Sequence, residues 1–494
     1  MNKMLLITFL SIFHISFGQT YSLKQVVGNS NLPLPTLTVG KPTAFNDDYM
    51  FIGANEGPVQ VYEFTEEKWT FLQEISEFDE RGFGRFIDIK NEVLVIGNTS
   101  TGEDRNEGTV FFYELQSGLW ERVDTVQTNL PLGTNSSPFW GAGLSLGDGF
   151  VSVGRNNGNS RFIHVVSEIS EGDWEITDTL NTPDFISSTF TAASDNELIV
   201  SGQFFFGINR LYSFERNENG VWDEDPESIN VPSDVSVSSL GFDISLLGDY
   251  LLVGSPEDRI NDLDEAGSVV LFENIGGTWT FVEQFVSDNP TEGARFGHSV
   301  ALSENEFIIG SPGTEQAYLY TKEGVNTWNN TQIITQELDE EDERDRFGFN
   351  VDFTRDQVVI FDLQNAYVYD TDAVDCNGEN AGGAIIDICC RCSGGNTGEE
   401  IELNSNDCLI TSVSDFSEEE SSTVFPNPAF NTITIKGKKG DKVTLLNSLG
   451  NRLFESDMTG DQMEISLDSY QGGNYFIEVK NNNRINTTEF IHIK

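Results

Sequence analysis

The sequence predicts an all-β protein: a seven-bladed β-propeller followed by a Cys-rich spacer and a small C-terminal β-sandwich. Three observations lead to this prediction. Short apolar runs that end in glycine recur every 44 to 57 residues between about residues 40 and 370. Each repeat contains four strand-like segments, which is the pattern of a propeller blade. The composition then changes abruptly near residue 372 and again near residue 425.

Length and charge narrow the class of protein. The chain has 494 residues, enough for two or three domains, and 80 acidic against 28 basic residues give a formal charge of −52. A surface this negative repels nucleic acid and anionic lipid, so we expect no nucleic-acid partner. The charge is explained either by solubility outside the cell or by acidic loops that hold a divalent cation.

Residues 1–18 are typical of a secretory signal peptide. A basic start precedes the apolar run 4–17, and small residues before Gln19 suit cleavage. The run is too short to span a bilayer, and no later segment approaches about 20 apolar residues. We therefore expect an exported protein without a transmembrane segment.

The clearest repeat lies at residues 295–312. Phe296-Gly297 opens it, residues 299–302 form one expected strand, and a polar turn leads to a second strand that ends at Gly310. The pattern gives seven copies, whose second strands end at Gly53, Gly97, Gly154, Gly202, Gly254, Gly310 and Phe361.

Tryptophans mark the start of the fourth strand in most repeats. Such a set could form a sugar-stacking site, but one Trp per repeat at a fixed register favours packing between blades. Trp140 differs, because it stands before Gly141 where other copies carry Phe. The six in register are Trp69, Trp120, Trp174, Trp222, Trp279 and Trp328.

The seventh repeat lacks a fourth strand, since the Gly- and Cys-rich tract follows directly. Residues 21–27 align with residues 69–75, the fourth strand of the first repeat. We therefore expect an N-terminal strand to complete the last blade, which would leave no open seam in a propeller of residues 19–371.

The repeat resembles the FG-GAP repeat of integrin-α-type propellers. Phe296-Gly297 followed by Ile308-Ile309-Gly310-Ser311-Pro312 carries the resemblance, and weaker copies lie at 241–255 and 82–97. Calcium-binding members of that family carry a D-x-D-x-D-G loop between the first two strands. The links at 246–249 and 303–306 lack this loop. We therefore expect no cofactor and no metal site in the blades; calcium stays an open alternative that this loop motif does not support.

The spacer, residues 372–408, resembles short D-C-x-G…D-x-C-G-x-C-x-G-G modules of secreted bacterial surface proteins. No His accompanies its cysteines and the compartment is oxidising, so disulfides are favoured over zinc. We expect them not to support the propeller. The pairing stays open, and an odd count leaves one cysteine over. The candidates are Cys376, Cys389, Cys390, Cys392 and Cys408.

An acidic linker, residues 409–424, leads to a β module at residues 425–494. On composition alone this module is a small accessory β-sandwich. Its distinctive residues are Phe425, Pro426, Asn427, Pro428, Gly473, Tyr475 and Lys494. Through these residues the module resembles the type A C-terminal sorting domain of type IX secretion. The resemblance implies a Bacteroidetes-type bacterium, export to the outer-membrane exterior, and the type IX machinery as a partner.

The sequence contains no H-E-x-x-H or P-loop pattern. The histidines outside residues 1–18 stand in unrelated contexts that suit structural roles: His164, His298 and His492. The richest polar surfaces are the loops 98–108 and 257–267. We expect no catalytic residues and a surface-displayed, non-enzymatic binding or adhesion protein with an extracellular protein or glycan ligand. The rival interpretations are a polysaccharide-directed hydrolase with its site at the propeller mouth and a structural surface-layer component.

Overall fold

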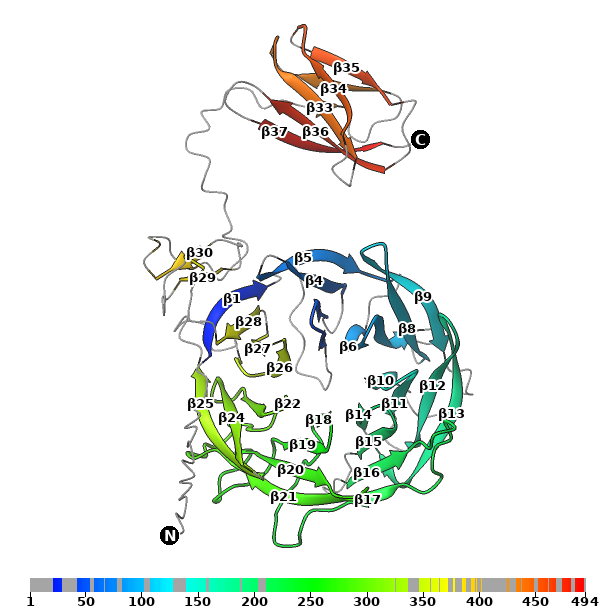
Figure 1. Cartoon of the computed structure of the whole chain (residues 1–494), viewed down its shortest axis with the longest axis vertical. Coiled ribbons are helices and arrows are strands. Elements are labelled where there is room, and N and C mark those ends of the chain that lie inside the picture. Colours follow the sequence, from blue (N-terminus) through cyan, green and yellow to red (C-terminus); the bar gives the residue numbers. More distant parts are fainter. Residues whose placement is uncertain are drawn as a thin grey trace, which may run out of the picture. The chain divides into compact units, whose positions relative to one another are not determined.

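The chain forms two compact units in the computed structural model, residues 1–408 and 409–494 (Figure 1). The structure describes residues 21–28, most of 42–371, and parts of 376–401 and of 424–492. Every regular element in these ranges is a β-strand, as the all-β prediction requires. The signal-peptide and linker predictions lie outside the described residues.

The described part of the first unit contains seven sheets, set in sequence order around a ring (Figure 1). Sheets one to six have four strands each, and sheet seven has six. The strands nearest the centre are β2 (Thr43–Phe45), β6 (Phe83–Lys90), β10 (Phe139–Leu146), β14 (Thr189–Ala193), β18 (Ile244–Leu247), β22 (Ser299–Leu302) and β26 (Asn350–Thr354). The second strands are β3 (Tyr49–Ile52), β7 (Val93–Thr101), β11 (Phe150–Asn156), β15 (Glu197–Gly202), β19 (Tyr250–Ser255), β23 (Glu306–Ser311) and β27 (Gln357–Phe361).

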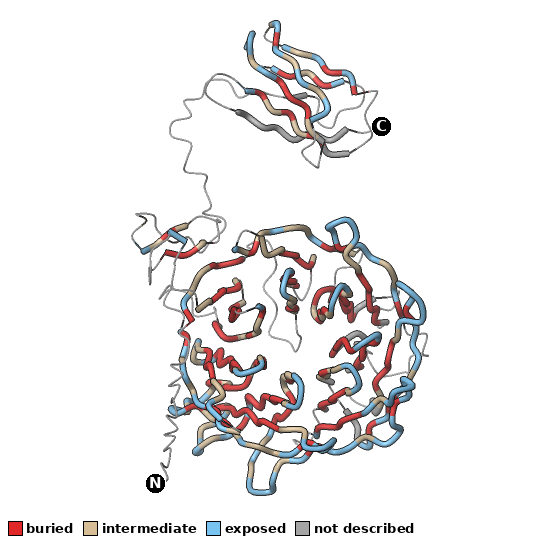
Figure 2. The backbone as a smooth tube through the Cα atoms, viewed as in Figure 1, coloured by how far each residue is buried: buried red, intermediate tan, exposed pale blue. Residues whose placement is uncertain are grey.

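The outer half of each sheet carries the aromatic segments of the repeat. The third strands are β4 (Val59–Thr65), β8 (Glu107–Gln116), β12 (Ser160–Ser170), β16 (Arg210–Glu215), β20 (Ser268–Asn274), β24 (Gln316–Gly324) and β28 (Asn365–Asp370). The outermost strands of sheets one to six are β5 (Lys68–Ile75), β9 (Leu119–Gln127), β13 (Asp173–Ile186), β17 (Glu227–Ile229), β21 (Trp279–Phe285) and β25 (Thr327–Thr335). The buried clusters combine residues of neighbouring sheets. Figure 2 shows that buried residues are concentrated on the inner strands, whereas the outermost strands are more exposed.

The N-terminal strand β1 (Ser22–Gly28) joins sheet seven, as predicted. It pairs antiparallel with β28, with Ser22 opposite Asp370 and Gly28 opposite Asn365. The first and last segments of the ring therefore share one sheet, and the seventh repeat obtains its missing fourth strand from the N-terminus.

Glutamines on the outermost strands hold neighbouring sheets together. Gln73 of sheet one accepts a hydrogen bond from the backbone N–H of Trp120 (2.8 Å) and donates one to its carbonyl (3.2 Å). Gln25 of β1 bonds Trp69 in the same way, at 2.9 and 2.8 Å. Gln332 of sheet six bonds Tyr21, at 2.9 and 2.8 Å. Residues 21–28 are thus bonded to both neighbouring sheets.

The six register tryptophans are buried between sheets, which confirms the packing prediction. Trp174 of sheet three stacks on Phe112 of sheet two, with ring centroids 4.4 Å apart. Trp120 of sheet two meets Tyr49 and Phe51 of sheet one edge-on, at 5.3 and 5.2 Å. Packing between blades, and not display to a ligand, is therefore the role of these indoles.

In two sheets the indole N–H of the register tryptophan bonds the first residue of the preceding sheet's second strand. Gln357 accepts this hydrogen bond from Trp69 (3.1 Å), and Glu197 accepts it from Trp279 (2.5 Å). Tyr21 occupies the tryptophan position of sheet seven and donates to Glu306 at 2.8 Å. Tyr21 is therefore the structural counterpart of Trp69, as the alignment predicts.

The repeated glycines are required by close backbone contact between sheets. A Cβ on Gly254 would collide with the carbonyl oxygen of Gly297, which follows Phe296 in the next repeat. Gly310 stands in the same relation to Gly348. Gly297 and Gly348 themselves have φ of 88° and 83°, a conformation that favours glycine.

Side chains of the innermost strands also bond the next sheet, around the centre of the ring. Asp88 of sheet two accepts from the Leu146 N–H (2.7 Å), and Asp243 of sheet five accepts from the Val300 N–H (2.9 Å). Asn350 of sheet seven donates to the Thr43 hydroxyl of sheet one. The last of these contacts links the seventh sheet to the first on the inner side of the ring.

The spacer extends sheet seven, which corrects the expectation that it does not support the propeller. Strand β29 (Ala384–Ile386) pairs parallel with β1 through Gln25 and Ile386, and β30 (Cys392–Gly394) pairs with β29. Buried Ile385 packs in the same cluster as Val26. The spacer therefore belongs to the first compact unit. Sequence reasoning treated it as separate because Gly- and Cys-rich composition gives no strand signal.

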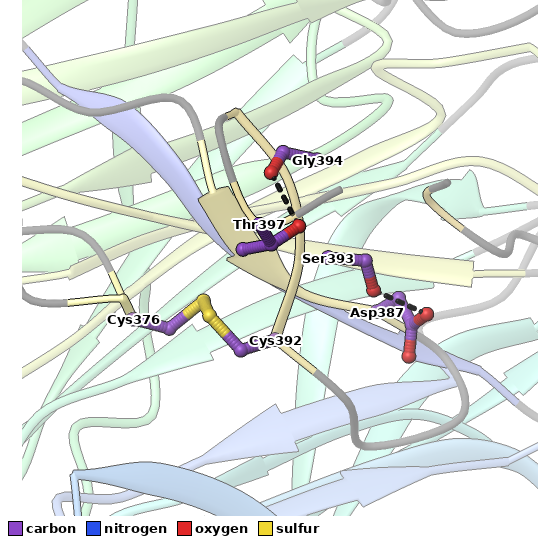
Figure 3. Close-up of a disulfide and its surroundings, with 6 residues drawn as sticks. All are labelled: Cys376, Asp387, Cys392, Ser393, Gly394 and Thr397. Atoms are coloured by element: carbon purple, nitrogen blue, oxygen red, sulfur yellow. Dashed lines mark hydrogen bonds between the residues drawn. A yellow bond between two sulfur atoms is a disulfide. The ribbon is translucent and has the colours of Figure 1, made fainter. Parts of the chain in front are cut away.

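One disulfide fixes the spacer. Cys376 bonds to Cys392, with their Cα atoms 5.7 Å apart, next to the buried hydrogen bond from the Ser393 hydroxyl to Asp387 (2.6 Å; Figure 3). Cys389, Cys390 and Cys408 lie outside the described residues. The prediction of disulfides is thus confirmed for one pair.

Replacing Cys376 and Cys392 by Ser should loosen β29 and β30. A disulfide that closes so short a loop contributes about 3 kcal/mol, and its loss frees the strands that cover β1. We expect faster amide exchange at 384–394, with a smaller effect on β22 to β25, when variant and parent are compared by hydrogen exchange. Unchanged exchange at 384–394 would show that pairing with β1 suffices without the bond.

The second unit is a pair of small sheets around its own core. One sheet has the order β31 (Val424–Phe425), β32 (Thr432–Lys436) and β35 (Gln462–Ser466). The other has the order β34 (Arg452–Asp457), β33 (Lys442–Asn447), β36 (Gly473–Lys480) and β37 (Ile485–His492). Ile433, Leu445 and Ile477 lie in its buried cluster.

Candidate functional site

The strongest candidate site lies at one end of the ring, where the innermost strands begin. Because neighbouring strands are antiparallel, each second strand ends at this same face. The loops between second and third strands, which sequence analysis singled out, are therefore on the face where the innermost strands start. In Figure 1 these strands lie closest to the centre of the ring.

Four aromatic side chains from consecutive sheets form a continuous row at this face. We call Phe190, Phe242, His298 and Phe349 the aromatic arc. The ring centroids are 5.9 Å apart for Phe190 and Phe242, 4.9 Å for Phe242 and His298, and 4.6 Å for His298 and Phe349. Successive rings are tilted by 30°, 52° and 44°, and all four side chains are only partly buried.

The local sequence explains why these residues line up. Phe242, His298 and Phe349 each follow the positive-φ glycine of their repeat (Gly241, Gly297 and Gly348) and precede an innermost strand. Phe190 is the second residue of β14. The repeat thus places one ring before the innermost strand of sheets five, six and seven, and these sheets bring the three rings into contact.

His298 has a defined protonation state within the arc. Its Nδ1 lies 2.9 Å from the carbonyl oxygen of Phe349, and a carbonyl can only accept, so Nδ1 carries the proton and Nε2 is an acceptor. Burial, with a smaller contribution from the nearby Arg295 and Arg346, lowers the pKa of His298 to about 4. The imidazole is therefore neutral at physiological pH.

This depressed pKa predicts a pH-dependent term in stability. The unfolded chain binds a proton near pH 6.5 and the folded chain only near pH 4, so stability falls as the pH drops through that window. We expect the free energy of unfolding to fall by about 3 kcal/mol relative to the variant His298→Asn, which keeps a donor for Phe349. Denaturant unfolding of both proteins between pH 7 and pH 4 measures the difference. If the free energy of unfolding changed with pH equally in both proteins, the prediction would be contradicted.

The loop 257–267 stands beside the arc and is organised by a buried carboxylate. Asp258 is 1% exposed and accepts hydrogen bonds from the hydroxyls of Ser238, Ser255 and Ser268, at 2.8, 2.7 and 2.5 Å. Asp258 therefore has a structural role. Sequence analysis did not single it out, because its three partners come from different segments.

The outer part of this loop is acidic, and an ion pair joins it to the segment that leads into the arc. Glu265 forms an ion pair of 2.8 Å with Arg295, three residues before His298. The Asp262 and Asp264 side chains, 96% and 69% exposed, pair with Arg259 at 3.5 and 3.3 Å. The loop that Glu265 joins to Arg295 therefore carries two further, largely exposed carboxylates.

The other sequence candidates are dispersed. His164 is buried in β12 against Phe162, and His492 lies in β37 of the second unit. Of the loop 98–108, residues 98–101 and 107–108 belong to β7 and β8, and 102–106 lie outside the described residues. Phe425, Gly473 and Tyr475 lie on β31 and β36, whereas Pro426, Asn427, Pro428 and Lys494 are outside the described ranges.

Two negative findings apply to the described residues. Among them, no group of three or more His, Cys, Asp or Glu side chains is arranged to hold a metal ion. In the same part of the chain, no helix has the length and hydropathy needed to cross a bilayer.

Solved structures with a similar course of the chain share little sequence with it. PorZ, an essential bacterial surface component of the type-IX secretion system of Porphyromonas gingivalis, is 12% identical over 92% of this chain and 75% of its own, with a TM-score of 0.30. Virginiamycin B lyase from Staphylococcus aureus is 12% identical over 68% and 97%, with a TM-score of 0.43. The computationally designed Ika8 protein is 13% identical over 70% and 99%, with a TM-score of 0.41. Scores this low carry no argument about this chain.

Sequence comparison identifies the second unit. No curated protein matches the chain. Residues 423–494 match the model of the secretion system C-terminal sorting domain, which confirms the resemblance noted at Phe425, Gly473 and Tyr475. The C-terminal module is thus a type IX secretion sorting domain, and the protein is secreted and attached to the cell surface by this route of the Bacteroidetes.

Proposed function

We propose that the protein is a non-enzymatic binding or adhesion protein, displayed outside the cell on a seven-bladed propeller of the FG-GAP type closed by its N-terminal strand. The observation that carries the proposal is the sorting domain at residues 423–494. It places the first unit at the cell exterior, where an extracellular protein or glycan is the available partner. The glycine contacts between Gly254 and Gly297 and between Gly310 and Gly348 support the FG-GAP assignment.

The face with the aromatic arc supports a binding role over hydrolysis. Glycoside hydrolysis needs two carboxyl groups on either side of the scissile bond. The groups that come together in the arc are three phenyl rings and one neutral imidazole from four sheets, which suit recognition of a ligand surface. The nearby carboxylates of Asp258 and Glu265 are engaged by serine hydroxyls and by Arg295.

An array of glycans and extracellular proteins, probed with the purified mature chain, tests this proposal. We expect saturable binding of one ligand class, independent of calcium. Release of reducing ends from a bound polysaccharide would instead establish the hydrolase. Ordered self-assembly without any ligand would establish the surface-layer component.

A further inference from the structure

The aromatic arc lies on the face of the ring where the innermost strands begin, and it joins side chains of four sheets. We propose that the aromatic arc binds a neutral oligosaccharide, with the rings of Phe242, His298 and Phe349 as the central stacking surface. This inference rests on the proposed binding function and names its ligand class.

The geometry of the arc fits an extended chain of small rings. Phe190, Phe242, His298 and Phe349 come from sheets four to seven and touch in sequence, with centroid steps of 4.6 to 5.9 Å. Each remains partly accessible. A row of accessible rings from separate sheets gives a ligand several stacking positions on a rigid scaffold.

The chemistry of the arc matches the two sides of a sugar. One side of a pyranose presents C–H groups, which pack on the electron-rich face of an aromatic ring. The edge presents hydroxyls, which need acceptors. Nε2 of His298 is an acceptor, because Nδ1 donates to the Phe349 carbonyl.

Charge argues for a neutral ligand. The formal charge of −52 repels polyanions such as nucleic acids or uronic-acid polymers. At the arc itself, Arg295 and Arg346 disfavour a further positive charge, as their effect on the pKa of His298 shows. A cation is therefore unfavourable at the rings and an anion is unfavourable in the field of the whole protein. A neutral sugar avoids both costs.

The test compares ring-removing variants with a matched control in the full mature chain. Phe242→Leu and Phe349→Leu keep apolar bulk but remove the ring. Phe71→Leu makes the same change on β5, where Phe71 is 56% exposed on the outermost strand of sheet one. The probes are neutral β-linked glucose oligosaccharides of two to six units, a wider array of neutral glycans, and an oligogalacturonate as the acidic comparison. Melting temperatures confirm that the variants are folded.

We expect the parent to bind at least one neutral glycan, with affinity that rises with chain length. Each arc variant should lose tenfold or more in affinity, and Phe71→Leu should stay within twofold of the parent. Binding of neutral glycans that the arc variants leave unchanged overturns the inference. So does preference for the acidic oligomer or for a protein, although the proposed binding function would then stand. Failure of every probe and every arrayed ligand would overturn both.

Discussion

A chain that lacks Tyr21–Val27 should aggregate or melt far below the parent, because β1 completes the seventh sheet. Tyr21, Val26 and Val27 are buried, and burying one such side chain stabilises a protein by about 1.5–3 kcal/mol. The deletion also breaks the pairing with β28 and β29. Together these losses approach the whole stability of a typical domain, about 5–15 kcal/mol. Thermal unfolding and light scattering of the purified variant measure the effect.

Point variants separate the strand's sheet pairing from its contacts to neighbouring sheets. Gln25→Ala removes both hydrogen bonds to Trp69 in a buried setting and should cost about 2 kcal/mol. Ser22→Ala, at an exposed position of the same strand, should stay within about 0.5 kcal/mol of the parent. A deletion variant as stable as the parent would show that the ring holds without its N-terminal strand.

The repeats and the N-terminal pairing could be predicted because the physical requirements repeat along the chain. Gly254 and Gly310 stand where the backbones of two neighbouring sheets come so close that no Cβ fits. The alignment of Tyr21 with Trp69 placed residues 21–27 on sheet seven before any geometry was known, and the hydrogen bond from Tyr21 to Glu306 shows the shared role. A residue that is required at the same position of every repeat can be recognised in a single sequence, because the repeats can be compared with one another.

The fourth strand of sheet four shows where the repeat pattern fails. Trp222 is buried like its counterparts, yet it forms only an isolated bridge with Arg216, and β17 begins later, at Glu227. Pro226 stands between them and has no N–H to give to a ladder. The register tryptophan therefore predicts the packing of its indole more reliably than the start of its strand.

The candidate site was harder to predict because it depends on contacts between repeats. Phe242, His298 and Phe349 each appear locally as one residue after a glycine, and 51 or more residues separate them in the chain. Only the ring of sheets brings them together. A comparison of the position after each repeat glycine could have found three of the four residues. Phe190 does not follow a repeat glycine, so this comparison would not find it.

Export depends on the second unit, and its removal should stop the protein in the periplasm. Residues 423–494 match the sorting domain, and the boundary between the two compact units falls after Cys408. A chain cut after Ser421 keeps the whole first unit, including the spacer strands and the Cys376–Cys392 bond. We expect it to cross the inner membrane, fold, and accumulate in the periplasm of the native host, as cell fractionation would show.

The reciprocal experiment asks whether the sorting domain is sufficient. It has its own buried cluster around Ile433, Leu445 and Ile477, so it should fold behind an unrelated cargo. Residues 422–494, placed after a signal peptide and a fluorescent protein, should carry the fluorescence to the cell surface. The matched control is the same fusion without residues 422–494, which should remain periplasmic. Surface exposure of the truncated chain, or periplasmic retention of the full fusion, would mean that sorting information lies in the first unit. The ring with its aromatic arc would then itself have to contact the secretion machinery.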